Sequence, residues 1–452
     1  MEQFTIQDIL TATGGALRGE ISLDVPISDV VIDSRQIKPG VLFVPIIGEN
    51  FDGHDFISQS FDNGAIVSLS DHELDETRPY ILVSNTLEAF QSIAGAYRSL
   101  FSIPFVGVTG SVGKTTTKEL IASVLSQRYN TLKNLGNLNN QLGVPRTLLR
   151  LDSSHEAAII EMGTNHFGEI ESLSKIVRPD VCVFTNIGDA HIEYFGSREG
   201  ILKAKCEMLE YRSADAPIIV NGDDPLLCAL RDEYPNVISY GSDCACDVYA
   251  ADIEELGLEG SNFTAHFGGQ SLRVTVPAPG SFMVQRALCA VAVGLALEVP
   301  PKKIAEGISL YAPVSGRMTI EKTDRYTLLN DAYNASPTSV AASIDVAAKA
   351  EGRHVLILGD MFELGKDELH YHQEIGAYAA GKRADLILCV GKLSKAICEG
   401  AQSVGGNAIH YKDKKSLLAA LPELLQPGDT ILIKASNGMK LQDVADYIKD
   451  NL

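Results

Sequence analysis

Short apolar runs recur along the chain, and most are followed by a turn and then by a stretch of helical length. Near the start, two such runs, 30–32 and 41–47, are separated by Pro39 and Gly40. Continuous apolar runs bounded by turn residues are typical of buried strands. The pattern predicts a small N-terminal α/β domain over residues 1–100.

The pattern changes at Pro104. The run 105–108 predicts a buried strand, which leads through a glycine-rich turn into a helix that extends to about Gln127. Further strands are predicted at 157–160, 181–184 and 218–220, with helical stretches between the first of them. Strands that alternate with helices form a mostly parallel sheet, so residues 101–313 are predicted to be a doubly wound central domain.

Prolines at 300, 301 and 313 mark the approach to a second boundary. Beyond it the alternation restarts, with predicted strands at 354–359, 386–391 and 430–433. We therefore expect a C-terminal, Rossmann-like α/β domain over residues 314–452. Three domains also agree with the length of the chain, given about 150 residues a domain.

Composition excludes several classes of protein. The net charge is −20 with no dense Lys/Arg run, whereas nucleic-acid-binding proteins present a basic face. No apolar run is long enough to span a membrane, and the first residues lack the basic and apolar regions of a secretory signal. The eight cysteines are scattered, several of them inside apolar runs, as expected of buried thiols in a reducing cytoplasm.

The most specific motif is the run 109–116, which reads TGSVGKTT. Small residues after a buried strand let successive backbone N–H groups point at phosphate oxygens, with the helix dipole behind them. Lys114 is placed to reach the β- and γ-phosphates, and the Thr115 hydroxyl to ligate Mg²⁺. The first glycine of the motif is displaced, since its usual position is occupied by Val108 and glycines stand at 107 and 110. The alternative is a plain strand-to-helix turn that contains Gly-Lys-Thr. The expected ATP-binding residues here are Gly110, Ser111, Val112, Gly113, Lys114, Thr115 and Thr116.

Polar residues follow two of the central strands. Glu161 ends one strand, and Asn186, Asp189 and His191 come after the next. Ligands of open α/β sheets gather at the carboxyl edge of the strands, so Glu161 is well placed to bind a metal. The alternatives are a solvated acid at a strand end and, for His191, a structural histidine.

Lys205 is expected to face inward. If residues 198–211 form a helix, Leu202, Cys206 and Leu209 share one face, and Lys205 joins them. Lys203 instead lies four residues from acids on either side, as a solvated lysine would. An inward lysine needs a partner or a modified charge, and a buried ion pair is the alternative.

Taken together, these motifs resemble those of the Mur ligases, the ATP-dependent amino-acid and peptide ligases of peptidoglycan precursor synthesis. The runs 109–116, 136–145, 161–163 and 186–193 are similar to family signatures in the same order. Finer motifs resemble those of the members that add D-alanyl-D-alanine. They lie at 33–35, 53–56, 331–337 and 358–365, so the resemblance extends over all three predicted domains.

The resemblance implies an ordered reaction. ATP phosphorylates the terminal carboxylate of a UDP-linked muramoyl tripeptide, and the amine of D-alanyl-D-alanine attacks the acyl phosphate. A tetrahedral intermediate then collapses to a UDP-linked pentapeptide and phosphate. Because two anions must approach each other, positioning and metal charge carry most of the catalysis. ATP and Mg²⁺ are the implied cofactors, and the protein is expected to be a cytoplasmic monomer.

The resemblance also implies roles for individual residues. Lys114, Glu161, His191 and Lys205 would be catalytic, with Thr115 and Glu161 holding one Mg²⁺ and His191 and Lys205 the other. Because an ammonium group cannot ligate a cation, the family carries a carbamylated lysine, and Lys205 occupies its position. Further implied nucleotide-binding residues are Asn137, Asn186, Arg317, Asp331 and Asn334. The UDP group is expected near Ser34, Arg35, Gly48, Asp52 and His54.

The chain departs from the family pattern in places. Phe282, Met283 and Arg286 replace a His-Asn pair and a further Asn that meet the adenine, and Phe282 is expected to stack instead. Near the C-terminus, 435–437 reads Ala-Ser-Asn instead of Gly-Ser-Arg. Asn330 stands where an acid is usual.

Two other functions fit parts of the pattern. One is a related ligase that adds a single amino acid, or a glutamate to a folate, and the motifs at 331–337 and 358–365 argue against it. The other is a regulatory P-loop protein, which does not account for a separate first domain. The sequence leaves open whether the third peptide residue of the substrate is lysine or diaminopimelate.

Overall fold

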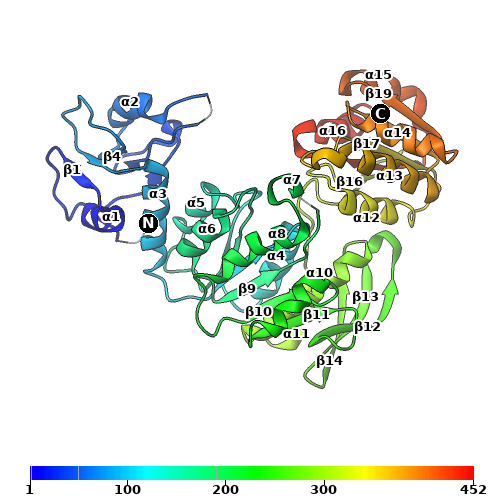
Figure 1. Cartoon of the computed structure of the whole chain (residues 1–452), viewed down its shortest axis with the longest axis horizontal. Coiled ribbons are helices and arrows are strands. Elements are labelled where there is room, and N and C mark those ends of the chain that lie inside the picture. Colours follow the sequence, from blue (N-terminus) through cyan, green and yellow to red (C-terminus); the bar gives the residue numbers. More distant parts are fainter. Residues whose placement is uncertain (2, 49, 190) are drawn as a thin grey trace.

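The computed structural model describes residues 1, 3–48, 50–189 and 191–452, and it folds them into three α/β units (Figure 1). Over these residues the units contain sheets of five, nine and six strands. The predicted fold class, α/β with three domains, is therefore confirmed. All the strands predicted from apolar runs are present.

The first sheet has the strand order β1-β5-β4-β3-β2. Its strands are β1 (Ala16–Arg18), β2 (Val30–Val31), β3 (Leu42–Phe43), β4 (Val67–Ser70) and β5 (Tyr80–Leu82). Only β1 runs antiparallel to its neighbour, β5. The helices of this unit are α1 (Ile6–Thr13), α2 (Ile57–Asp62) and α3 (Thr86–Arg98).

The central sheet has the order β14-β13-β12-β11-β10-β9-β6-β8-β7. Its parallel part consists of β6 (Phe105–Thr109), β7 (Thr131–Lys133), β8 (Ala157–Glu161), β9 (Val181–Phe184), β10 (Ile218–Asn221) and β11 (Val237–Gly241). The sheet then extends through β12 (Val248–Glu255), β13 (Ser261–Phe267) and β14 (Gln270–Val276), and the last two pairings are antiparallel. This extension was not predicted, because β13 alternates between buried and partly exposed residues instead of forming an apolar run.

Helices cover both faces of the parallel part. They are α4 (Lys114–Leu125), α5 (Gly143–Leu148), α6 (Glu169–Val177), α7 (Ile192–Phe195), α8 (Arg198–Cys206), α9 (Pro225–Cys228), α10 (Ser281–Ala296) and α11 (Pro301–Ser309). The helix predicted over 198–211 is shorter than expected. After Cys206 the chain tightens into a 3₁₀ turn, Glu207–Leu209.

The third sheet has the order β15-β16-β20-β17-β18-β19, which is parallel apart from β15. Its strands are β15 (Thr319–Lys322), β16 (Thr327–Asn330), β17 (His354–Gly359), β18 (Leu386–Val390), β19 (Ala408–Tyr411) and β20 (Thr430–Lys434). Its helices are α12 (Pro337–Ala347), α13 (Glu368–Gly381), α14 (Ser394–Ser403), α15 (Lys414–Leu424) and α16 (Gln442–Asn451).

The first and second units share one hydrophobic core. α3 packs on α1 of its own unit and on α5 and α6 of the central unit, and Figure 1 shows it between them. Tyr97 of α3 is fully buried and donates a hydrogen bond to the Leu151 carbonyl oxygen at 2.8 Å. Arg98 Nε donates to the Val177 carbonyl at 2.7 Å. The third unit instead has its own cores on the two faces of its sheet.

Within the described part of the chain, no helix combines the length and the apolar character needed to cross a membrane.

Helices α13 and α14 approach closely at two glycines. A Cβ atom at Gly376 would lie 1.9 Å from the Ile397 carbonyl oxygen, and one at Gly400 would lie 2.1 Å from the Gln373 carbonyl oxygen. We predict that Gly376→Val lowers the free energy of unfolding of the C-terminal unit by about 3 kcal/mol, because backbone atoms must move apart. Gly381→Ala on the same helix has open space around it and is expected to raise that free energy by about 0.5 kcal/mol. Urea unfolding measures both, and equal effects would contradict the prediction.

Candidate active site

The glycine-rich loop lies between β6 and α4, as predicted. Gly110 and Gly113 adopt φ values of 147° and 82°, which glycine tolerates without strain. A side chain at Gly110 would also place its Cβ 2.0 Å from Thr185 Oγ1. The Lys114 ammonium folds back over the loop and donates to the carbonyl oxygen of Gly110 at 2.8 Å. Burial lowers the pKa of Lys114.

The segment after β9 holds this loop in place. The backbone N–H of Val112 donates to Asn186 Oδ1 at 2.9 Å, and Asn186 Nδ2 donates to the Val112 carbonyl at 3.0 Å. The Ser111 N–H donates to the Asn186 carbonyl, and the Gly188 N–H donates to Ser111 Oγ, both at 2.9 Å. Asn186 therefore fixes the loop, and its amide is already engaged with the protein.

Glu161 stands at the end of β8 and is only 1% exposed. Its carboxylate accepts hydrogen bonds from Thr115 Oγ1 at 2.8 Å and from Asn139 Nδ2 at 2.7 Å. A buried carboxylate needs such partners to offset the loss of water. The structure thus brings together the two residues expected to hold one Mg²⁺, and it adds Asn139, which lies in the resembling run 136–145.

Lys118 is a buried cation that the sequence analysis missed. It lies on α4, is fully buried, and donates to the Asn134 carbonyl at 2.7 Å. Its ammonium is 3.7 Å from Glu161 Oε2 and 3.2 Å from Glu119 Oε1. Lys118 lies four residues after Lys114, so both lysines are on one side of the helix, and this spacing could have predicted that Lys118 faces the site.

Lys205 is buried as predicted, at 2% exposure, whereas Lys203 is exposed. Burial is the main cause that lowers the pKa of Lys205 well below its ordinary value, and the charge of Lys114 adds to it. Among the described residues no carboxylate forms an ion pair with Lys205, so the structure offers no support for the alternative of a buried ion pair. The buried face of α8 includes Ile201 and Ala204, and Cys206 is only partly buried, so the face is rotated slightly from the expected one.

His191 meets a residue of the third unit. Its Nδ1 lies 2.5 Å from Glu363 Oε2, and both residues have left-handed backbones, with φ of 62° and 61°. Strained backbones of this kind are concentrated at functional sites. The imidazole holds the pKa of Glu363 below its ordinary value. Glu363 belongs to the resembling run 358–365, but its pairing with His191 was not predicted.

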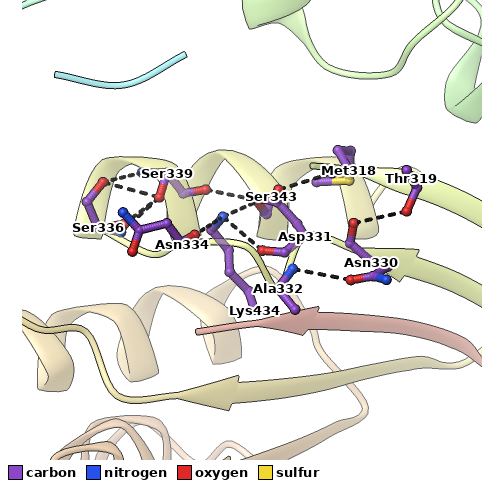
Figure 2. Close-up of polar contacts among 10 residues, drawn as sticks. All are labelled: Met318, Thr319, Asn330, Asp331, Ala332, Asn334, Ser336, Ser339, Ser343 and Lys434. Atoms are coloured by element: carbon purple, nitrogen blue, oxygen red, sulfur yellow. Dashed lines mark hydrogen bonds and ion pairs between the residues drawn. The ribbon is translucent and has the colours of Figure 1, made fainter. Parts of the chain in front are cut away.

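Asp331 is the centre of a polar network in the third unit (Figure 2). Its carboxylate accepts from Ser343 Oγ at 2.6 Å and from the Met318 N–H at 3.1 Å, and it pairs with the Lys434 ammonium. Lys434 is 3% exposed and also donates to the Asn334 carbonyl at 3.0 Å. Asp331 and Lys434 therefore fix the loop that presents Asn334, and Lys434 was not predicted.

Asn330, the departure beside this network, is fully buried. Its amide nitrogen donates to Gln442 Oε1 at 2.9 Å, and its Oδ1 accepts from the Ala332 N–H at 3.3 Å. The Asn330 amide both donates to Gln442 and accepts from Ala332, whereas an ionised acid at this position could only accept.

Residues of the central and C-terminal units surround one cavity of about 890 Å³. Arg317 lies against it, with its guanidinium 3.9 Å above the Tyr333 ring. Of the predicted residues, the cavity is lined by Ser111, Val112, Gly113, Lys114, Thr115, Thr116, Asn137, Glu161, Asn186, His191, Arg317, Asp331 and Asn334. Gly110 and Lys205 are not part of its lining.

The positions that depart from the adenine pattern line the same cavity. The Arg286 guanidinium lies 4.4 Å from the Phe282 ring centre, so it covers one face of the ring expected to stack on adenine. The guanidinium also lies close to Gly113, since a Cβ there would be 2.7 Å from Arg286 Nε. Burial lowers the pKa of Arg286 to about 10. This arginine therefore adds a cation beside the phosphate loop.

The residues predicted to meet UDP lie in the first unit, away from this cavity's lining. Ser34 and Arg35 form a 3₁₀ turn after Asp33, and Arg35 pairs with Asp33 at 2.8 Å. Gly48 donates to the Phe51 carbonyl at 2.9 Å. Asp52 and His54 are paired at 2.6 Å.

Comparisons with known proteins agree with this geometry. Residues 26–98 match the Mur ligase family catalytic domain, 108–294 the Mur ligase middle domain, and 316–437 the Mur ligase glutamate ligase domain. The UDP-N-acetylmuramoyl-tripeptide–D-alanyl-D-alanine ligase of Bacillus subtilis is 38% identical over 458 residues, which cover 99% of each chain.

Solved structures give the same result. MurF from Acinetobacter baumannii superposes with a TM-score of 0.94 at 33% identity, covering 100% of both chains. MurF from Thermotoga maritima, solved in complex with ADP, superposes with a TM-score of 0.83 at 27% identity, covering 93% of this chain and 97% of that one. With matches in all three units and a relative above 30% identity over its whole length, the chain belongs to the Mur ligase family.

Proposed function

We propose that this chain joins D-alanyl-D-alanine to the terminal carboxylate of UDP-N-acetylmuramoyl-tripeptide, with ATP as the phosphoryl donor. The observation that carries the proposal is the cavity in which the phosphate loop, Glu161, His191 and Arg317 converge. The names of the full-length relatives supply the substrates. The domain roles follow: UDP binding by residues 1–100, ATP binding by 101–313, and presentation of the dipeptide by 314–452.

The donor set at Glu161 suits Mg²⁺. Thr115 Oγ1 and Glu161 Oε2 are both hard oxygen donors, and they lie 2.8 Å apart. Two adjacent ligands of an octahedral Mg²⁺ lie about 2.9 Å apart, given metal–oxygen distances of about 2.0–2.1 Å. These residues would hold the ion, whose charge neutralises the phosphates and the substrate carboxylate.

The chain's own groups then position the reactants. The N–H groups of the phosphate loop and the Lys114 ammonium orient the γ-phosphate toward the tripeptide carboxylate. Arg317 adds a positive charge from the C-terminal unit. It can bind the transferring phosphoryl group only when the C-terminal unit is packed against the phosphate loop of the central unit. The amine of D-alanyl-D-alanine attacks the acyl phosphate, and phosphate leaves as the peptide bond forms.

For Lys205 we propose a carbamate. Burial lowers the pKa of the Lys205 amine, which raises the share of its neutral form, and a neutral amine adds CO₂ to give a carbamate with release of one proton to solvent. The carbamate is anionic and would join His191 as a donor for a second Mg²⁺. His191 is paired with Glu363 at 2.5 Å, so its ring is oriented from the C-terminal unit.

The UDP group is proposed to rest on the first unit, near Ser34, Arg35, Gly48, Asp52 and His54. Arg35 is 87% exposed and provides a cation for the diphosphate. We also propose that the protein acts as a monomer in the cytoplasm. Its cysteines are all free thiols, as a reducing compartment requires.

Replacing Lys114 tests the phosphate site. We predict that Lys114→Ala lowers kcat/KM by about 10²–10³-fold, because one preorganised charge at the transferring phosphoryl group is lost. Coupled ADP release measures this, with D-alanyl-D-alanine and each UDP-tripeptide, containing lysine or diaminopimelate. Lys303→Ala is the control, since Lys303 is half-exposed and pairs with Glu306.

The same assay separates the competing functions. ADP release with a folate and glutamate, or with a single amino acid, would favour a related ligase. Phosphate release that needs neither the UDP-peptide nor the dipeptide would favour a regulatory P-loop protein.

Replacing Lys205 separates stability from activity. The pKa of Lys205 is lower in the folded chain than its ordinary value of 10.5 in the unfolded chain. Below pH 10.5 the unfolded chain therefore binds more protons, and the free energy of unfolding decreases as pH falls. In CO₂-free buffer at pH 7, Lys205→Met is predicted to raise the free energy of unfolding by about 1–3 kcal/mol, because it removes an uncompensated buried polar group, with the gain shrinking toward pH 10.5. The variant is expected to lose ligase activity. Urea unfolding across this pH range measures the effect.

Lys203→Met is the matched control, since Lys203 is exposed on the same helix. In ¹³C-bicarbonate with Mg²⁺, the parent protein is expected to show a carbamate signal that Lys205→Met lacks. An active protein without that signal would refute the carbamate.

A further inference from the structure

Three side chains meet on the first unit, outside the lining of the ATP cavity. His54 comes from a 3₁₀ turn, Gly53–Phe56, while Asp71 and His72 directly follow β4. One ligand atom from each lies within 4.8 Å of the others. His54 Nε2 is 3.3 Å from Asp71 Oδ1, and His72 Nδ1 is 2.8 Å from the same oxygen.

The hydrogen bonds of His54 indicate which of its two ring nitrogens can bind a metal ion. Asp52 Oδ1 accepts from the His54 backbone N–H at 2.9 Å and lies 2.6 Å from His54 Nδ1, so Nδ1 carries the proton. Nε2 then presents a lone pair, which accepts one long hydrogen bond from the Asp71 N–H, at 3.5 Å. Asp71 Oδ1 therefore lies within 3.3 Å of a ring nitrogen of each histidine, which gathers two imidazoles and one carboxylate around one point.

We propose that His54, Asp71 and His72 bind a divalent transition-metal ion of the Zn²⁺ class. Ligand atoms of a tetrahedral Zn²⁺ lie about 3.4 Å apart, given metal–ligand distances of about 2.0–2.2 Å. The 3.3 Å between His54 Nε2 and Asp71 Oδ1 matches this value. His72 Nδ1 is hydrogen-bonded to the same oxygen at 2.8 Å, so the exposed His72 ring would move outward to admit the ion. Two imidazoles and one carboxylate favour Zn²⁺ over Mg²⁺, which prefers oxygen ligands alone. Metal-binding histidines usually donate their second ring N–H to a carboxylate that orients the ring, and the contact of His54 with Asp52 is of this kind.

The site has a buried and an open side. The His54 side chain is 5% exposed, whereas that of His72 is 54% exposed, so an ion and a water molecule can enter from solvent. The metal would join the segment that contains Asp52 and His54 to the end of β4. The inference does not rest on the proposed ligase activity, because its test measures metal binding.

The test uses the full chain and Zn²⁺ or Co²⁺ alone. By equilibrium dialysis, the parent protein is expected to bind one more Zn²⁺ per chain than His72→Gln, and the subtraction removes any ion held in the ATP cavity. Co²⁺ is expected to give visible absorption bands that His72→Gln lacks. Zn²⁺ is expected to raise the melting temperature of the parent more than that of the variant. His72 is exposed, so its replacement leaves the fold intact.

Two further variants sharpen the result. Asp52→Asn, which removes only the orienting carboxylate, is expected to weaken Zn²⁺ binding by about 10–100-fold. His370→Gln is the control, because His370 is another exposed histidine, paired with Glu374 on a helix. Equal Zn²⁺ stoichiometry and affinity in the parent and in His72→Gln would overturn the proposal.

Discussion

The carboxylate of Glu161 is removed from water, and it must therefore be met by donors from the protein. Thr115, Asn139 and Lys118 meet it, and they come from the start of α4, from the loop after β7 and from the second turn of α4. One buried charge thus fixes the segments that face the phosphates. Groups held in this way need not reorganise when charge moves during the reaction, which is the basis of electrostatic catalysis.

Much of this arrangement is contained in local sequence patterns. Buried parallel strands are continuous apolar runs, so β6, β8 and β9 were predictable, and the helical spacing around Lys205 predicted its burial. The pairing of His191 with Glu363 was not predictable, because it joins residues far apart in the chain through the placement of two units. Lys118 was missed because its main acceptor is a backbone carbonyl, which no residue type reveals. The hairpin β13–β14 lacked an apolar run because one of its faces is exposed.

The chain is strongly acidic, yet cations gather at its cavity. Burial lowers the pKa of Lys114 and of Arg286, and the positive charge of Arg317 acts in the same direction on both. This repulsion is relieved when an anion lies between them. Arg286 therefore adds to the attraction of this part of the cavity for phosphates.

The position of α3 between two sheets has a consequence for the way in which the chain unfolds. Ile93, Ala94 and Tyr97 are fully buried in a core to which both units contribute, so opening either unit exposes part of the interior of the other. The C-terminal unit keeps two cores of its own. We expect two cooperative blocks rather than three, with amide exchange slow across residues 1–313 as one block and a separate opening of residues 314–452. Three units that are separate in architecture are thus expected to unfold as two.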